Sequence, residues 1–135
     1  EAAQAGVEIA LIVRAICCPI PGQEYSHTTR VTRIVDTFRE HAGVWSFGNG
    51  GAPKLSLGSP DWRRRNLYRR IEAVTPILDP DLKQELIDML SIQLSDKRKA
   101  CFVDDRLRNR WKSSRPQKEK VRSQYSFYEY LREKI

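Results

Sequence analysis

The apolar residues of this chain change their spacing from one segment to the next, and the spacing predicts its secondary structure. Residues 7–13 form a nearly continuous apolar run between Gly6 and a loop that contains Pro19 and Pro21. Such a run is typical of a strand buried on both faces of a sheet. We therefore predict a central strand here, with Arg14 at its C-terminal end, where open α/β sheets usually place ligand-binding groups.

Further strands are predicted downstream. Large apolar and small polar residues alternate over residues 44–47, a glycine-rich turn follows, and residues 54–57 suggest the partner strand of a hairpin. Residues 70–77 are rich in β-branched side chains and residues 100–103 are largely apolar, so both are strand candidates. Residues 28–41 fit either an extended segment or a helix, because their apolar residues also fall at helical spacing.

The clearest helix begins after Asp79, a favourable N-cap that is followed by Pro80 at the first helical position. Residues 106–120 are expected to form a basic loop region, and residues 121–131 an amphipathic terminal helix. The apolar stripe of the first helix is expected to face the core and consists of Leu82, Leu86, Met89, Leu90 and Leu94.

This mixture of strands and helices places the chain in the α/β or α+β class. A length of 135 residues corresponds to one ordinary domain, so we treat residues 1–135 as a single unit. Residues 1–6 read like the end of a helix closed by Gly6, and we expect further chain before them.

Charge narrows the choice of partner. Lysine and arginine number 24 against 17 acidic residues, and the net charge of +7 favours polyanions such as nucleic acid, nucleotides, polyphosphate or anionic lipid. The basic residues crowd into two segments, 63–70 and 106–122. Trp62, Asn66 and Tyr68 accompany the first segment, whereas the second fits a solvated basic face equally well.

Cysteine usage and hydropathy exclude several classes of protein. Three cysteines, two of them adjacent, do not form the framework of a disulfide-stabilised secreted domain, so a reducing compartment is expected. Neither the cysteines nor the two histidines have the spacing of zinc ligands. No apolar run reaches the roughly 20 residues of a membrane-spanning helix.

His41 is the first candidate for chemistry, because imidazole exchanges protons near neutral pH and can act as a phosphoryl-transfer nucleophile. A lone histidine is nevertheless more often structural, and His27, in a polar loop, is expected at the surface. The segment Asn49–Gly51 can direct successive backbone amides toward an anion, and it fits an ordinary hairpin turn equally well.

Residues 59–66 bring together hydroxyl, carboxylate, indole and guanidinium groups. Arginine forks bind phosphate oxygens in a bidentate manner, which makes this segment a candidate phosphate contact. Trp62 is expected to fill the core rather than to stack on a base.

Several short motifs follow one another along the chain, and their order is more specific than any one of them. They are Ala5-Gly6-Val7, Ile12-Val13-Arg14-Ala15-Ile16-Cys17-Cys18, Pro21-Gly22, Ile34-Val35, Glu40-His41, Asn49-Gly50-Gly51, Gly58-Ser59-Pro60-Asp61-Trp62, Asn66-Leu67, Arg70-Ile71-Glu72 and Pro76-Ile77-Leu78-Asp79-Pro80. In this order they resemble the C-terminal domain of the first polyphosphate kinase family, essentially from end to end.

The resemblance implies an α/β fold of the phospholipase-D-like superfamily, with a mixed sheet flanked by helices. It also implies a kinase, an ATP:polyphosphate phosphotransferase that reversibly transfers the terminal phosphate of ATP to inorganic polyphosphate and depends on Mg²⁺. In that family the phosphate passes through a phosphohistidine on the preceding domain, which this chain lacks. The isolated domain is therefore expected to be inactive.

The resemblance also assigns site residues. His41 is similar to the second essential histidine of the family, expected to act as general acid/base or to steady the transferring phosphate. Arg14 is similar to the arginine that binds the nucleotide phosphate. The remaining matched positions are expected to line or support the site, and they are Asn49, Gly50, Ser59, Asp61, Asn66 and Arg70.

The implied partners are ATP or ADP, inorganic polyphosphate, the upstream domains of the same polypeptide and further copies of the full enzyme, but no nucleic acid. The Mg²⁺ ligands are expected outside this chain. The protein is expected in the cytoplasm, and a peripheral association with the inner membrane is left open.

Two positions depart from the family pattern. Gly43 stands where members often carry a basic residue, and Pro60 stands where alanine is common. Half of a phospholipase-D-like phosphodiesterase or nuclease is one alternative, but it calls for lysine at position 43 and aspartate at position 48, and both are glycine. A basic nucleic-acid-binding module that stacks bases on Trp62 and Tyr68 is the other.

Overall fold

The computed structural model describes residues 1–112 and 121–134. Contacts divide the chain into two compact units: unit 1 comprises residues 1–39 and 89–135, and unit 2 comprises residues 40–88. In chain order the elements are β1 (Ile9–Ile12), η1 (Glu24–Ser26), β2 (Thr29–Ile34), β3 (Val44–Phe47), η2 (Asn49–Gly51), β4 (Lys54–Gly58), α1 (Arg64–Arg69), β5 (Val74–Pro76), α2 (Pro80–Ser95), β6 (Ala100–Val103), β7 (Asn109–Trp111) and α3 (Ser123–Arg132). The expectation of a single domain stays a prediction.

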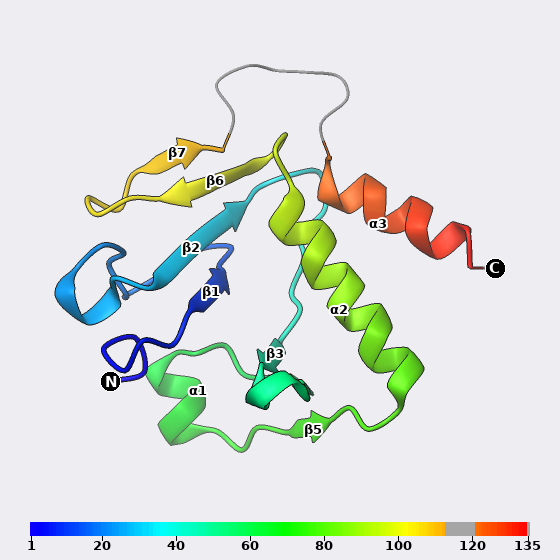
Figure 1. The fold of residues 1–135 in the computed structure, drawn as a ribbon, viewed down its shortest axis with the longest axis horizontal. Helices are drawn as coiled ribbons and strands as arrows, with labels where there is room; N and C mark the ends of the chain where they lie inside the picture. Colours follow the sequence, from blue (N-terminus) through cyan, green and yellow to red (C-terminus); the bar gives the residue numbers. More distant parts are fainter. Residues whose placement is uncertain (113–120, 135) are drawn as a thin grey trace. The chain divides into compact units, whose positions relative to one another are not determined.

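Unit 1 is built on a four-stranded sheet in the order β1-β2-β6-β7 (Figure 1). The strands β1 and β2 are parallel, and the other neighbours are antiparallel, so the sheet is mixed as expected. The segment 28–41, which fitted strand or helix, forms β2 and then continues without regular structure. Val31 and Ala100 are almost fully buried at the centre of this sheet and form part of the core of unit 1.

The prediction of a central first strand is wrong for the described residues. β1 pairs only with β2 and lies at the edge of the sheet. No described strand pairs with its other edge, and in β1 Ala10 is exposed while the other residues are half-buried. The preceding turn matches its prediction: Gly6 has a φ of +83°, and the amides of Gly6 and Val7 donate to the carbonyls of Ala3 and Ala2, the pattern that closes a helix.

Asp96 connects three elements of unit 1. Its Oδ1 accepts hydrogen bonds from the backbone amides of Arg98, Lys99 and Ala100, and its Oδ2 accepts one from the amide of Ser123 at 2.7 Å. The side chain is fully buried. One carboxylate therefore fixes the end of α2, the start of β6 and the start of α3.

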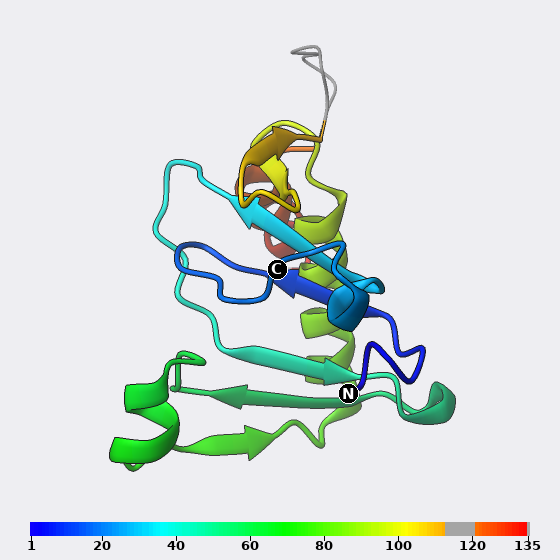
Figure 2. The same ribbon diagram turned by 90° about the vertical axis from the view of Figure 1, so that its left-hand side faces the viewer.

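Unit 2 contains a three-stranded antiparallel sheet in the order β3-β4-β5, whose strands lie side by side in Figure 2. The predicted hairpin is confirmed, with Val44 opposite Leu57 and Phe47 opposite Lys54. Leu55 of β4 is 2% exposed and is a buried apolar residue of this unit. The candidate strand at residues 70–77 is confirmed only over its last part, as β5.

The helices partly match expectation. Asp79 caps α2 through hydrogen bonds to its Oδ1 from the amides of Asp81 and Leu82, and the terminal helix is confirmed as α3. The stripe on α2 does not form a buried core: Leu82 is 56% exposed, Leu94 is exposed as well, and the other three members are only half-buried. In the described part of the chain, no helix is both long enough and apolar enough to cross a membrane.

One α-helix and one strand were not predicted. α1 forms within the first basic segment, and β7 forms within residues 106–112, which were expected to be loop. The rest of that basic loop, residues 113–120, lies outside the described residues.

Candidate functional site

His41 lies just before β3, in a segment without regular structure. Its Nε2 is 3.5 Å from Oδ1 of Asp61, which follows β4 at the same end of the hairpin. The side chains of His41 and Asp61 are 60% and 45% exposed. The imidazole is therefore accessible to a substrate, while a carboxylate stands next to one of its nitrogens.

Asp61 also faces an arginine. Its second oxygen, Oδ2, is 3.9 Å from Nε of Arg63. Exposed ion pairs at this distance contribute little to folding stability. Asp61 thus stands between a histidine and a cation, with one carboxylate oxygen toward each.

Glu72 holds the segment that carries Asp61. The hydroxyl of Ser59 donates to its Oε2 at 2.5 Å, and the side-chain amide of Asn66 donates to its Oε1 at 2.7 Å. The backbone amide of Ser59 also donates to the carbonyl of Ala73. We call these three side chains, Glu72, Ser59 and Asn66, the Glu72 clamp, because they fix both ends of the loop between β4 and α1.

Neighbouring side chains stabilise the negative charge of Glu72. The hydrogen bond from Ser59 lowers the pKa of the Glu72 carboxyl, partial burial opposes this, and Asn66 and the positive charge of Arg70 lower it further. Arg70 therefore belongs to the same group of side chains. Asn66 is 6% exposed, and its Oδ1 has no hydrogen-bond partner among the described residues.

The structure thus brings together five predicted site residues of unit 2 and adds a sixth side chain. His41, Asp61, Ser59, Asn66 and Arg70 lie around the loop that Glu72 holds. The sequence reasoning did not assign Glu72 to the site. Its signal was present, since Glu72 is an acidic residue two positions after a strongly basic segment.

Asn49 and Gly50 lie at the other end of β3. With a rise of about 3.3 Å per residue, the strand separates this turn from His41. Asn49 and Gly50 have positive φ angles of 45° and 63°, and the side-chain amide of Asn49 donates to the carbonyl of Ala52. The amides of Gly51 and Ala52 donate within the turn, as in a hairpin connection, so an anion nest here stays a prediction.

Arg14 belongs to unit 1. It is exposed in the loop after β1, and the loop is held by a hydrogen bond from Arg33 to the carbonyl of the next residue, Ala15. The role of Arg14 as a phosphate ligand stays a prediction.

Close packing surrounds Gly43. A Cβ atom at this position would lie 2.1 Å from the carbonyl oxygen of Gly58, and a Cβ at Gly58 would lie 2.5 Å from the ring of Trp45. A lysine at position 43, which a phosphodiesterase site of this kind requires, therefore does not fit without a shift of the backbone. Trp62 is 74% exposed, its ring centroid 6.4 Å from that of Trp45, so the prediction that Trp62 fills the core is wrong.

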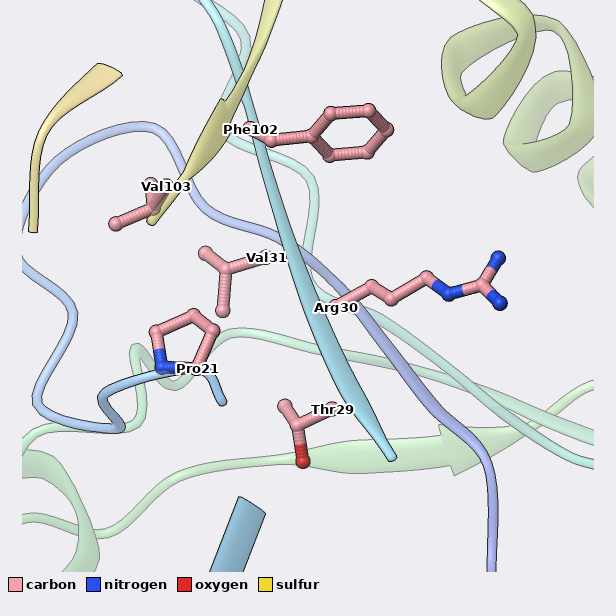
Figure 3. A pocket seen from close by; sticks show the side chains of 6 residues that line it. All are labelled: Pro21, Thr29, Arg30, Val31, Phe102 and Val103. Carbon is pink, nitrogen blue, oxygen red and sulfur yellow. The ribbon is translucent and has the colours of Figure 1, made fainter. Parts of the chain in front are cut away.

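Surface pockets lie elsewhere in the two units. In unit 1, a pocket of about 400 Å³ is lined by residues of β2 and β6 and by Pro21 (Figure 3). Another is lined by residues of α1 in unit 2. Neither is lined by a predicted site residue. Within residues 1–112 and 121–134, no group of three or more His, Cys, Asp or Glu side chains is placed to hold a metal ion.

Together the fold and the site define a class of protein: a mixed α/β domain with an accessible histidine–carboxylate pair next to a basic helix. The chain matches the polyphosphate kinase C-terminal domain 2 family over residues 1–124. The polyphosphate kinase of Escherichia coli strain K12 is 43% identical over 132 residues, which are 97% of this chain and 19% of that protein. The polyphosphate kinase of Thermosynechococcus vestitus is 50% identical over 101 residues, 74% of this chain and 14% of that protein.

A solved structure agrees with these matches. The crystal structure of polyphosphate kinase from Porphyromonas gingivalis superimposes with a TM-score of 0.93 at 50% identity, over 98% of this chain and 20% of that one. This chain therefore belongs to the polyphosphate kinase C-terminal domain family. It spans about a fifth of the length of these relatives. The expected mixed α/β fold is confirmed.

Proposed function

We propose that this chain is the C-terminal part of an ATP:polyphosphate phosphotransferase, which reversibly transfers the terminal phosphate of ATP to inorganic polyphosphate. The observation that carries the proposal is the match over 98% of the chain, at 50% identity, to a solved polyphosphate kinase. The net charge of +7 supports it, because both substrates are polyanions.

In the proposed reaction, the bond between the β–γ bridging oxygen and the γ-phosphorus of ATP breaks and ADP leaves. The phosphoryl group is carried by a histidine of the preceding domain, and a terminal oxygen of the polyphosphate chain then takes it over. This chain supplies positioning and positive charge, which are the main requirements of phosphoryl transfer.

His41 serves in this proposal as general acid/base or as a donor to the transferring phosphate. Its exposure leaves the imidazole accessible, and Asp61 at 3.5 Å orients the ring. The Glu72 clamp keeps Asp61 in place through Ser59 and Asn66. Arg14 binds a phosphate of the nucleotide, and the cations Arg63 and Arg70 add positive charge near His41 and Asp61.

The full enzyme requires further parts in this proposal. Mg²⁺ neutralises phosphate charge when bound, and the proposal places its ligands in the upstream part of the polypeptide. The upstream domains supply the phosphohistidine, and the full enzyme forms homo-oligomers. Free Cys17, Cys18 and Cys101 support a cytoplasmic location.

The test is formation of inorganic polyphosphate from ATP and Mg²⁺ by the full-length polypeptide that contains this chain, with residues 1–135 alone as the comparison. We expect polymer from the full-length protein and none from the isolated chain. A folded full-length protein that makes no polymer but cleaves or binds nucleic acid would overturn the proposal.

A further inference from the structure

Arg33 of β2 connects two distant parts of unit 1 through one guanidinium group. Its Nη2 donates to the carbonyl oxygen of Ala15 at 2.8 Å, and its Nη1 donates to Oδ1 of Asn109 at 2.9 Å. Ala15 lies in the loop after β1, and Asn109 begins β7, at the opposite edge of the sheet. The planar guanidinium reaches both acceptors at once, which a lysine ammonium does less well.

The surroundings of Arg33 do not suggest a role in charge balance. Among the described residues, no carboxylate forms an ion pair with it, and its buried Nε has no hydrogen-bond partner. Its neighbours are the thiols of Cys17 and Cys101, whose pKa values are raised by burial and lowered in part by the charge of Arg33. A partly buried cation without an acidic partner is costly, so its hydrogen bonds to Ala15 and Asn109 are the interactions that explain its presence.

The loop that Arg33 holds carries Arg14. One residue past β1, the amide of Val13 still donates a hydrogen bond to the carbonyl of Thr32 in β2, at 2.9 Å. Ala15 lies two residues farther along. The hydrogen bond from Arg33 therefore fixes the backbone immediately after Arg14, beyond the end of β1.

We propose that Arg33 is a positioning residue for nucleotide binding: by holding the carbonyl of Ala15, it fixes the backbone from which Arg14 reaches the nucleotide phosphate. The inference rests on the proposed function, because it takes Arg14 as the phosphate-binding arginine. Binding groups act efficiently only when their supports hold them within about 0.5 Å of the productive position.

Arg30 provides a matched control on the same strand. Figure 3 shows Arg30 and Phe102 on one side of β2 and β6, and Val31 and Val103 on the other. Because side chains alternate along a strand, Arg33 lies on the side of Val31. Arg30→Ala thus removes the same charge from the same strand on the opposite face, and we expect it to leave loop exchange and the KM for ATP unchanged.

The first measurement is hydrogen exchange of the amides in residues 14–18 of the full-length protein. We expect faster exchange in Arg33→Ala than in wild type or Arg30→Ala, and a smaller change in Asn109→Ala, which removes only the second anchor. Arg33→Lys is expected to stay close to Arg33→Ala. Unchanged exchange in Arg33→Ala would overturn the link between Arg33 and the loop, and Asn109→Ala decides the point if Arg33→Ala does not fold.

The second measurement is a double-mutant cycle on the KM for ATP. Arg33→Ala is expected to raise the KM about threefold to tenfold, the factor that loss of one hydrogen bond typically gives. In an Arg14→Ala background the same change is expected to add less than about twofold, because a positioning residue acts through Arg14. Fully additive effects would overturn the proposal. An unchanged KM in Arg14→Ala alone would instead refute the proposed role of Arg14, and the exchange measurement would still decide what Arg33 holds.

Discussion

At the scale of single residues, the candidate site depends on the side-chain hydrogen bonds that Glu72 accepts. Glu72 accepts from Ser59 with one oxygen and from Asn66 with the other. Asp61 lies between those two donors in sequence and faces His41. The position of the histidine–carboxylate pair is therefore linked to a glutamate that does not touch it.

Glu72→Gln tests this link. Glutamine keeps one acceptor oxygen but presents an amide donor where Ser59 or Asn66 also donates, so half of the clamp is lost. We expect polyphosphate synthesis by the full-length protein to fall about tenfold to hundredfold, since small displacements of positioning groups have effects of this size. Glu24→Gln, at an exposed position in unit 1, is the control, and equal rates for both variants would contradict the clamp.

Many of the site residues could be predicted from the sequence, because the order of the motifs indicates which residues belong to the site. Ser59, Asp61, Asn66 and His41 were all named from the sequence, and the structure brings them together. Glu72 was not assigned a role, because the sequence does not show that its two oxygens face a serine and an asparagine from different parts of a loop. The exposure of Trp62 was missed for a similar reason. Tryptophan is usually buried, but whether a particular tryptophan is buried depends on the residues that pack around it.

At the scale of elements, the hairpin of β3 and β4 positions His41 at one end and the glycine turn at the other. The two strands approach closely at the His41 end, where Gly58 donates its amide to the carbonyl of Gly43 at 2.9 Å. Neither glycine leaves room for a side chain there. Close approach of the two backbones is thus part of the site.

Gly43→Ala and Gly48→Ala form a matched pair on this hairpin. The new methyl group at position 43 would meet the carbonyl oxygen of Gly58 at 2.1 Å, whereas nothing lies within 4 Å of one at position 48. Gly48 also has a right-handed helical conformation that alanine adopts readily. We expect Gly43→Ala to lower the unfolding free energy by about 1–3 kcal/mol in chemical denaturation. Gly48→Ala is expected to have little effect, and a reversed order would contradict the packing described.

The N-cap of α2 gives a second prediction. Asp79 accepts hydrogen bonds from the amides of Asp81 and Leu82, each at 2.9 Å. Asp79→Ala removes both and is expected to cost about 1 kcal/mol of unfolding free energy. The measurement is thermal or urea unfolding, with Asp79→Asn as a variant that retains an acceptor and most of the stability.

Elements with local signals were predicted, and elements that depend on distant partners were not. The Asp79-Pro80 start of α2 and the β3–β4 hairpin carry their own caps and turns. By contrast, α1 has six residues without an apolar stripe, and β7 has three residues that form a strand only because β6 pairs with them. The stripe on α2 was read correctly as helix and wrongly as core.

At the scale of the whole molecule, carboxylates that accept hydrogen bonds hold segments together. An Arg122 hydrogen bond lowers the pKa of Asp36, with burial opposing it. Burial alone would raise the pKa of Asp96, but backbone amide donors outweigh it, and the pKa of Asp104 is likewise lowered by the amide and side chain of Arg108 and by Arg110. Of these, Asp96 joins the most elements.

Acid should therefore weaken the fold. A carboxyl whose pKa is lower in the folded than in the unfolded chain contributes its full stability above the unfolded pKa of about 3.9. As the pH falls below about 4, the unfolded chain takes up protons first, and that stability is progressively lost. We expect the unfolding free energy, measured by denaturant titration, to be flat from pH 7 to 5 and to fall between pH 4 and 3.

Asp96→Asn tests how much the Asp96 carboxylate alone contributes to the acid sensitivity of the fold. Asparagine places an amide donor against a backbone donor, so we expect a loss of about 2 kcal/mol at pH 7. The fall in stability below pH 4 should also become shallower, because one linked proton is removed. An unchanged slope would mean that Asp96 is not among the groups that make the fold acid-sensitive.

The central claim is that His41 takes part in phosphoryl transfer, and polyphosphate synthesis by full-length His41→Ala tests it most directly. His27→Ala is the matched control, since His27 is the only other histidine and lies exposed in unit 1. With both variants shown to be folded, we expect His41→Ala to be slowed by about a hundredfold or more, as loss of a general acid/base typically produces. His27→Ala is expected to match wild type. Equal rates for wild type and His41→Ala would contradict the account and make His41 a structural residue.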